Sequence, residues 1–162
     1  MTSVECASSS PQATRALGRA LGALCTGGEC LLLHGPLGAG KTCFVQGLAL
    51  GLGVSEKEPV VSPTFVIHAQ YAGRVELNHV DAYRLAGAPD VPDLGLEELY
   101  EGPGVTAVEW AEFLGPVIPA ERLDISLAIA GPSERALSFE VRPPSSTRYA
   151  GLLERFAAAA LA

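Results

Sequence analysis

The residues best suited to chemistry form one glycine-rich segment. Residues 35–42 read GPLGAGKT, which matches the phosphate-binding pattern GxxxxGK[ST] at every fixed position. Glycines allow the backbone N–H groups to turn toward phosphate oxygens, and the ammonium group of Lys41 adds a positive charge. The hydroxyl of Thr42 is a suitable ligand for Mg²⁺. The segment therefore predicts a site for ATP and Mg²⁺.

A nucleotide-hydrolysing site also needs a carboxylate near the metal ion and a group that orients water. Asp81 follows the stretch 75–80, and Glu109 ends the stretch 105–109, directly before Trp110. Strand ends face the ligand crevice in open α/β sheets, so both acids are candidates for these roles. The alternative for each is a solvent-exposed carboxylate, because most acidic side chains lie on the surface.

Three other side chains have a structural and a functional interpretation. Thr64, in the segment SPTF at residues 62–65, is a candidate switch residue that senses the terminal phosphate, but Ser-Pro pairs often begin ordinary turns. His79 is a candidate base, although a single histidine beside a strand is more often structural. Trp110, the one tryptophan of the chain, either packs in the core or contacts a nucleotide or a partner.

The surrounding pattern places the glycine-rich segment between a strand and a helix. The apolar run at 29–34 predicts a buried, parallel strand, and residues 41–50 predict the following helix. Ser10 before Pro11 predicts the start of an earlier helix, which Gly27 and Gly28 end. The same reasoning predicts strands at 64–71, 74–80, 105–110, 123–129 and 136–141, and helices at 94–100 and 147–161.

These elements and the composition predict one domain. The chain has 162 residues, of which 48% are apolar and 18% charged, and a strand–loop–helix unit is followed by several strands. We therefore expect a single α/β domain over residues 1–162, with residues 1–9 as a flexible tail. The four cysteines form no CxxC pair and match no zinc spacing, which favours reduced thiols.

Charge and hydropathy indicate which partners to expect. The net charge of −7 argues against a broad surface that grips tRNA or DNA by its phosphates. Residues 1–10 have neither the basic nor the apolar region of a secretory signal, and every apolar run is far shorter than the roughly 20 residues of a membrane span. We therefore expect a cytoplasmic protein that binds neither membrane nor DNA.

Five motifs, in this order and spacing, resemble the TsaE family, also called YjeE. They are HGPLGAGKTCF at 34–44, SPTF at 62–65, HVDAYRL at 79–85, GLEEL at 95–99 and VEW at 108–110. The resemblance implies a P-loop NTPase-like α/β domain with a mixed parallel and antiparallel sheet flanked by helices. Members of this family bind ATP and hydrolyse it slowly when alone.

The resemblance also implies a pathway and partners. TsaE proteins act with TsaD and TsaB in the biosynthesis of threonylcarbamoyladenosine, the modification of adenosine 37 in tRNAs that read codons starting with A. TsaD transfers the threonylcarbamoyl group, and ATP turnover by TsaE resets or drives the partner complex. Contact with tRNA is therefore expected to be indirect.

Site residues follow from the same resemblance. The phosphates are expected to contact the loop residues Leu37, Gly38, Ala39, Gly40, Lys41 and Thr42. Thr42 and Glu109 match the Mg²⁺ contacts, and Asp81 matches the acid needed for hydrolysis. Thr14 matches a position near the nucleotide base, and Arg135 matches an arginine near the nucleotide. Arg135 follows Glu134, where the family tends to have glycine.

Two other functions fit parts of the sequence. A P-loop kinase for a small molecule would need a second substrate pocket and usually an arginine-bearing lid, and the chain has only 11 Lys and Arg residues. The second alternative is a nucleotide-dependent interaction module without significant turnover. A GTPase is disfavoured because the sequence lacks an N/T-K-x-D element for guanine.

Overall fold

The computed structural model describes residues 1–63, 67–87 and 94–161. The strands are β1 (Ser3–Ser8), β2 (Cys30–His34), β3 (His68–Tyr71), β4 (Leu77–Asp81), β5 (Val105–Glu109), β6 (Arg122–Ile129) and β7 (Arg135–Arg142). The helices are α1 (Pro11–Leu24), α2 (Lys41–Gly51), α3 (Leu96–Glu101) and α4 (Thr147–Ala160), with the 3₁₀ segments η1 (Tyr83–Leu85) and η3 (Ala111–Val117).

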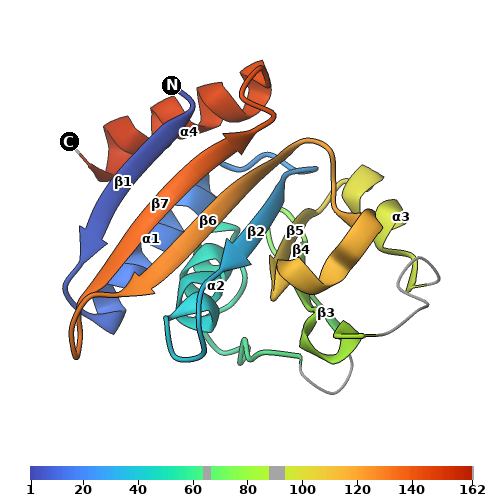
Figure 1. The fold of residues 1–162 in the computed structure, drawn as a ribbon, viewed down its shortest axis with the longest axis horizontal. Helices are drawn as coiled ribbons and strands as arrows, with labels where there is room; N and C mark the ends of the chain where they lie inside the picture. The colour runs from blue at the N-terminus through green and yellow to red at the C-terminus, as the bar shows by residue number, and fades with distance from the viewer. Residues whose placement is uncertain (64–66, 88–93, 162) are drawn as a thin grey trace.

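The strands of the described residues form one sheet in the order β1-β7-β6-β2-β5-β4-β3 (Figure 1). β2 pairs in parallel with both β5 and β6, and β4 pairs in parallel with β5. β3, β7 and β1 join antiparallel at the two sides. The mixed sheet and the single α/β domain are thus confirmed, and β2, β4 and β5 end at the same edge.

Helical segments cover the two faces of the sheet unequally. α1, α2 and α4 pack on one face, where residues such as Leu33, Phe44 and Phe156 form the larger core. On the opposite face η1, α3 and η3 cover β2, β4 and β5, around Leu32 and Val108. Leu32 and Leu33 are adjacent in β2 yet belong to different clusters, because alternate side chains of a strand point to opposite faces.

The helices α1 and α2 cross with their backbones in direct contact. A Cβ atom at Gly47 would lie 1.9 Å from the carbonyl oxygen of Arg15, and one at Gly18 would lie 2.2 Å from that of Phe44. Only glycine fits at such distances. The contact fixes α2 against α1, and α2 begins at Lys41, so this crossing also positions the phosphate loop.

The expected flexible tail at residues 1–9 is wrong, because Ser3–Ser8 form the edge strand β1. Val4 lies opposite Phe139 in the antiparallel ladder with β7, and Val4 and Cys6 pack against the main core. The segment has only six residues and small side chains at most of them, so its alternation is a weak signal. The open edge of β7 supplies the hydrogen bonds that order it, and that edge exists only in the folded sheet.

The other elements match the expected ones with shifts at their ends. Ser10 is the N-cap of α1, where its side chain accepts a hydrogen bond from the backbone N–H of Ala13. Trp110, expected to end a strand, instead adopts a left-handed conformation between β5 and η3. Residues 64–66, and Thr64 with them, lie outside the described residues. In the described part of the chain, no helix has the length and apolarity needed to cross a membrane.

Candidate nucleotide-binding site

The phosphate loop joins the end of β2 to the start of α2. His34 ends β2, residues 35–40 form the turn, and α2 starts at Lys41. Gly40, the N-cap of α2, has φ 102°, a left-handed conformation that a side chain would strain. The free backbone N–H groups at the start of α2 and the positive end of its dipole point toward the loop, which favours an anion there.

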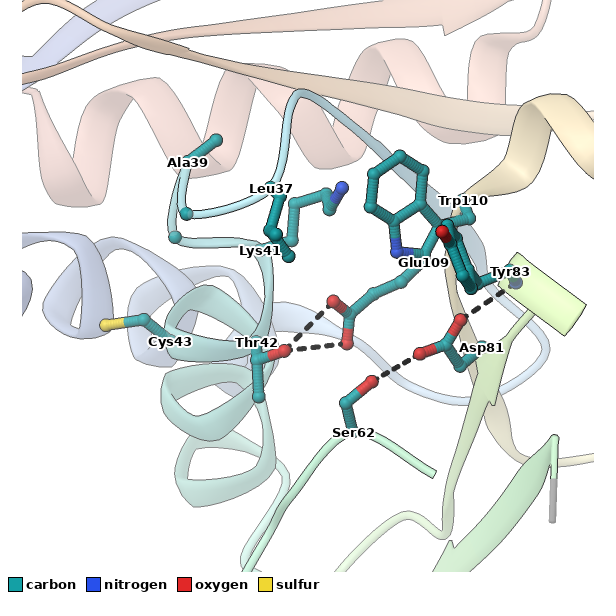
Figure 2. A pocket seen from close by; sticks show the side chains of 12 residues that line it. Leu37, Ala39, Lys41, Thr42, Cys43, Ser62, Asp81, Tyr83, Glu109 and Trp110 are labelled. Atoms are coloured by element: carbon teal, nitrogen blue, oxygen red, sulfur yellow. Dashed lines mark hydrogen bonds between the residues drawn. The ribbon is translucent and has the colours of Figure 1, made fainter. Parts of the chain in front are cut away.

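A pocket of about 570 Å³ lies against this loop (Figure 2). The loop and the first turn of α2 contribute residues 37–43 to its wall, and the opposite wall comes from the ends of β4 and β5 and from the segment that precedes β3. Its lining therefore unites the phosphate loop with both candidate carboxylates, together with Ser62, Tyr83 and Trp110.

The two carboxylates lie side by side. Asp81 and Glu109 are paired positions on the parallel strands β4 and β5, and each is only 3% exposed. Glu109 reaches toward α2, where the Thr42 hydroxyl is 2.9 and 3.1 Å from its two carboxylate oxygens (Figure 2). The register of the sheet thus brings together two acids that are 28 positions apart in the sequence (109 − 81).

Asp81 has its own set of donors. The Ser62 hydroxyl donates to Oδ2 at 2.5 Å, and the backbone N–H of Tyr83 donates to Oδ1 at 2.9 Å (Figure 2). These two bonds fix the plane of the carboxylate at the pocket wall. Ser62 was not singled out from the sequence, although its place in the SPTF segment was a usable signal.

Lys41 lies between the loop and the aromatic wall of the pocket. Its Nζ donates to the carbonyl oxygen of Gly35 at 2.5 Å and lies 3.4 Å from the centroid of the Trp110 ring. Burial lowers the pKa of Lys41, while the Glu109, Glu112 and Asp81 carboxylates act in the opposite direction. The ammonium group is thus held by a carbonyl and an aromatic face, which are weaker partners than phosphate oxygens.

Trp110 is held in place by local structure. Its backbone has φ 58° and ψ 43°, which is uncommon for a bulky side chain. Its ring lies 5.2 Å from that of Tyr83 and 6.2 Å from that of Phe113, measured between centroids. Residues with such backbone angles often occur at functional sites. The conformation turns the chain from β5 into η3 and leaves the ring beside Lys41.

Thr14 and Arg135 lie behind the phosphate loop and do not line the pocket. The Thr14 hydroxyl is buried and shares a 2.7 Å hydrogen bond with that of Ser8. Arg135 donates from Nε to the carbonyl oxygen of Ala39 and from Nη2 to that of Gly38, both at 3.1 Å. In this arrangement Arg135 braces the loop through its backbone.

The donor atoms at Thr42 and Glu109 fit Mg²⁺. A hydroxyl and a carboxylate that already lie within hydrogen-bond distance are the oxygen ligands that hard cations prefer. In the part of the chain that the structure describes, no group of three or more His, Cys, Asp or Glu side chains forms a metal cluster. Two protein oxygens suit Mg²⁺ that shares its coordination with phosphates and water, rather than a cation in a protein cage.

The phosphate loop between a parallel strand and a helix, with carboxylates at the neighbouring strand ends, defines a P-loop NTPase-like protein. The family model described as threonylcarbamoyl adenosine biosynthesis protein TsaE matches residues 8–137. The chain belongs to this TsaE family.

Individual relatives agree with this assignment. The tRNA threonylcarbamoyladenosine biosynthesis protein TsaE of Treponema pallidum is 42% identical over 135 residues, which cover 83% of this chain and 98% of that protein. The protein of the same name from Bacillus subtilis is 42% identical over 130 residues and 80% of each chain. The crystal structure of Bacillus subtilis YdiB is similar with a TM-score of 0.83 and 35% identity, over 98% of this chain and 97% of that one.

Proposed function

We propose that this protein binds ATP with Mg²⁺ and hydrolyses it in support of the threonylcarbamoylation of adenosine 37 in tRNAs that read codons starting with A. The observation that carries the proposal is the contact between Thr42 and Glu109 beside Asp81, on one wall of the pocket that the phosphate loop lines. Membership of the TsaE family supports the pathway.

Nucleotide binding follows from the loop and its charge. The backbone N–H groups at residues 37–42 and the start of α2 would hold the phosphates, and Lys41, which contacts Gly35 and Trp110 in this structure, would supply its charge to the β- and γ-phosphates. Thr42 and Glu109 would hold Mg²⁺. When bound, the ion neutralises charge on the phosphate oxygens.

Asp81 is the residue that we assign to hydrolysis. Its carboxylate is fixed by Ser62 and by the backbone N–H of Tyr83, and it lines the phosphate pocket. In this place it orients a water molecule toward the γ-phosphate and accepts the proton that this water loses. Glu109 is engaged by Thr42 at the neighbouring position, so the two acids have separate tasks.

The proposed partners are counterparts of TsaD and TsaB. A protein with a net charge of −7 is poorly suited to holding tRNA alone, and we infer that it contacts tRNA only through these partners. Hydrolysis is expected to be slow in isolation, because the complex supplies the step to which ATP turnover is coupled.

Reconstitution tests this function. The purified protein is combined with TsaD and TsaB from the same organism, ATP, tRNA and a source of the threonylcarbamoyl donor. Repeated rounds of tRNA modification should require the protein and should be lost with Lys41→Ala. If TsaD and TsaB modify tRNA through repeated rounds equally well without this protein, the proposal is contradicted. Phosphate released to water, rather than transferred to an acceptor, separates this function from that of a small-molecule kinase.

A further inference from the structure

His79 makes the least expected contact of the site. It lies on β4 two residues before Asp81, is 0% exposed, and places Nε2 2.5 Å from the Oε2 atom of Glu109. With the Glu109 oxygen as the acceptor of this bond, Nε2 is the ring nitrogen that carries the hydrogen. Glu109 therefore receives two donors from different elements, the His79 imidazole from β4 and the Thr42 hydroxyl from α2.

We propose that His79 is a positioning residue that holds the Glu109 carboxylate toward Thr42 and thereby sets the affinity of the nucleotide site for Mg²⁺. The inference rests on the proposed function, because it assigns Glu109 to the metal ion. His79 lies behind Glu109 and does not line the pocket, so it acts through that carboxylate and not on the nucleotide itself.

The burial of His79 argues against a role in packing alone. Its Nδ1 atom is buried and has no hydrogen-bond partner in the described part of the protein. Leu77 and Val80 on the same strand and Ala107, its neighbour on β5, are all apolar and 0% exposed. An apolar side chain here would avoid the unpaired nitrogen. The hydrogen bond of the imidazole with Glu109, its one polar interaction among the described residues, offsets the cost of the unpaired nitrogen.

The charges around Glu109 show why it needs to be held. The Lys41 ammonium group lies in the same pocket, and Glu109 is its strongest carboxylate neighbour. A carboxylate free to rotate would turn toward that cation. Lys41 would then be unavailable to the nucleotide, and Glu109 would be unavailable to the metal ion. The bond from His79 keeps Glu109 with Thr42. Side chains that orient metal ligands in this way typically change metal affinity 10–100-fold when altered.

Two amide variants separate positioning from packing. In His79→Gln the amide nitrogen takes the place of Nε2 and keeps a donor beside Glu109. In His79→Asn the amide reaches only the place of Nδ1, which has no hydrogen-bond partner among the described residues. Both variants bury one amide, so they differ mainly in the donor to Glu109. His79→Leu removes the donor with an apolar side chain of comparable size.

Calorimetry measures the affinity of each variant for ADP, first in EDTA and then at increasing Mg²⁺ concentration. Urea unfolding of each variant shows whether it is folded. We expect His79→Asn and His79→Leu to need about 10-fold more Mg²⁺ or higher, with unchanged affinity in EDTA. His79→Gln should stay close to the unaltered protein. If His79→Asn fails to fold, His79→Leu decides the comparison.

Three results would overturn the proposal. One is an unchanged Mg²⁺ dependence in a folded variant without the donor. A second is a loss shared equally by His79→Gln and His79→Asn, which would indicate packing. A third is that the unaltered protein binds ADP equally well with and without Mg²⁺, which would show that Glu109 does not bind the metal ion. Failure of the unaltered protein to bind ADP at all would instead refute the nucleotide site, and this inference with it.

Discussion

Asp81 and Glu109 are paired neighbours at the ends of two parallel strands, yet among the described residues their carboxylates have no hydrogen-bond donor in common. Ser62 and the Tyr83 backbone hold Asp81, whereas Thr42 and His79 hold Glu109. Two like charges at adjacent positions would repel, and separate donors keep each in its own orientation. This division of partners is the basis for assigning hydrolysis to Asp81 and the metal ion to Glu109.

Asp81→Asn should abolish hydrolysis while nucleotide affinity is retained. Asparagine keeps the size of the side chain but cannot accept a proton from water, so we expect phosphate release to fall about 100-fold or more. Glu112→Gln is the matched control, because Glu112 is an exposed acid near the same site. If partner binding and tRNA modification survive in Asp81→Asn, the protein is a nucleotide-dependent interaction module instead.

Trp110 should report nucleotide binding. It is the one tryptophan in the sequence, and the Lys41 ammonium group lies 3.4 Å from its ring centroid. Because phosphates draw Lys41 away from the ring, tryptophan emission should change when ATP is added. Lys41→Ala should show altered emission before ATP is added and little change afterwards. Identical spectra with and without bound ATP would show that Lys41 stays on the ring.

Gly47→Ala should destabilise the protein through the contact between α1 and α2. The added methyl group would lie 1.9 Å from the Arg15 carbonyl oxygen, and the displacement should cost about 1–3 kcal/mol or more in the free energy of unfolding. Gly151→Ala is the control, since the nearest atom to a Cβ there is 3.8 Å away, and it should stabilise α4 by about 0.5–1 kcal/mol. Urea unfolding measures the stability of both variants. Equal changes in unfolding free energy for Gly47→Ala and Gly151→Ala would contradict the close contact between α1 and α2.

Glu29→Gln should weaken the fold at neutral pH but not in acid. Burial by itself would raise the pKa of Glu29, but backbone N–H groups of Thr26 and Gly27 and the charge of Arg148 lower the pKa overall below the ordinary value of a glutamate. A carboxyl group whose pKa is lowered by folding stabilises the folded protein at any pH above its ordinary, unfolded pKa. This stabilisation is lost as the pH falls through the pKa of the group in the folded protein. We expect the variant to lose about 1–3 kcal/mol at pH 7.

The pH dependence is the measurement for Glu29. The difference in unfolding free energy between Glu29→Gln and the unaltered protein should shrink as the pH falls through the lowered pKa of folded Glu29, because the protonated glutamate is then neutral, as glutamine is. Glu56→Gln, at an exposed position, should leave stability nearly unchanged. A difference that stays constant from pH 7 to acid would show that the lost interaction does not involve the charge.

Local patterns predicted much of this protein because several of its signals are short and specific. The phosphate loop between an apolar strand and a helix was readable from residues 29–50, and the N-cap at Ser10 was readable from two residues. The positions of Asp81 and Glu109 at strand ends were also predicted. The conformation of Trp110 was not, because the turn from β5 into η3 depends on packing with Tyr83 and Phe113.

By itself the sequence determined the loop chemistry, the order of most elements and the family, because these depend on residue types at short range. Only the tertiary structure decided the pairing of Asp81 with Glu109, the contact of His79 with Glu109, and the brace from Arg135. It also decided that Ser3–Ser8 form a strand, since β7 supplies the partner edge. These relationships join residues far apart in the chain, and strand register and packing set them only once the sheet has formed.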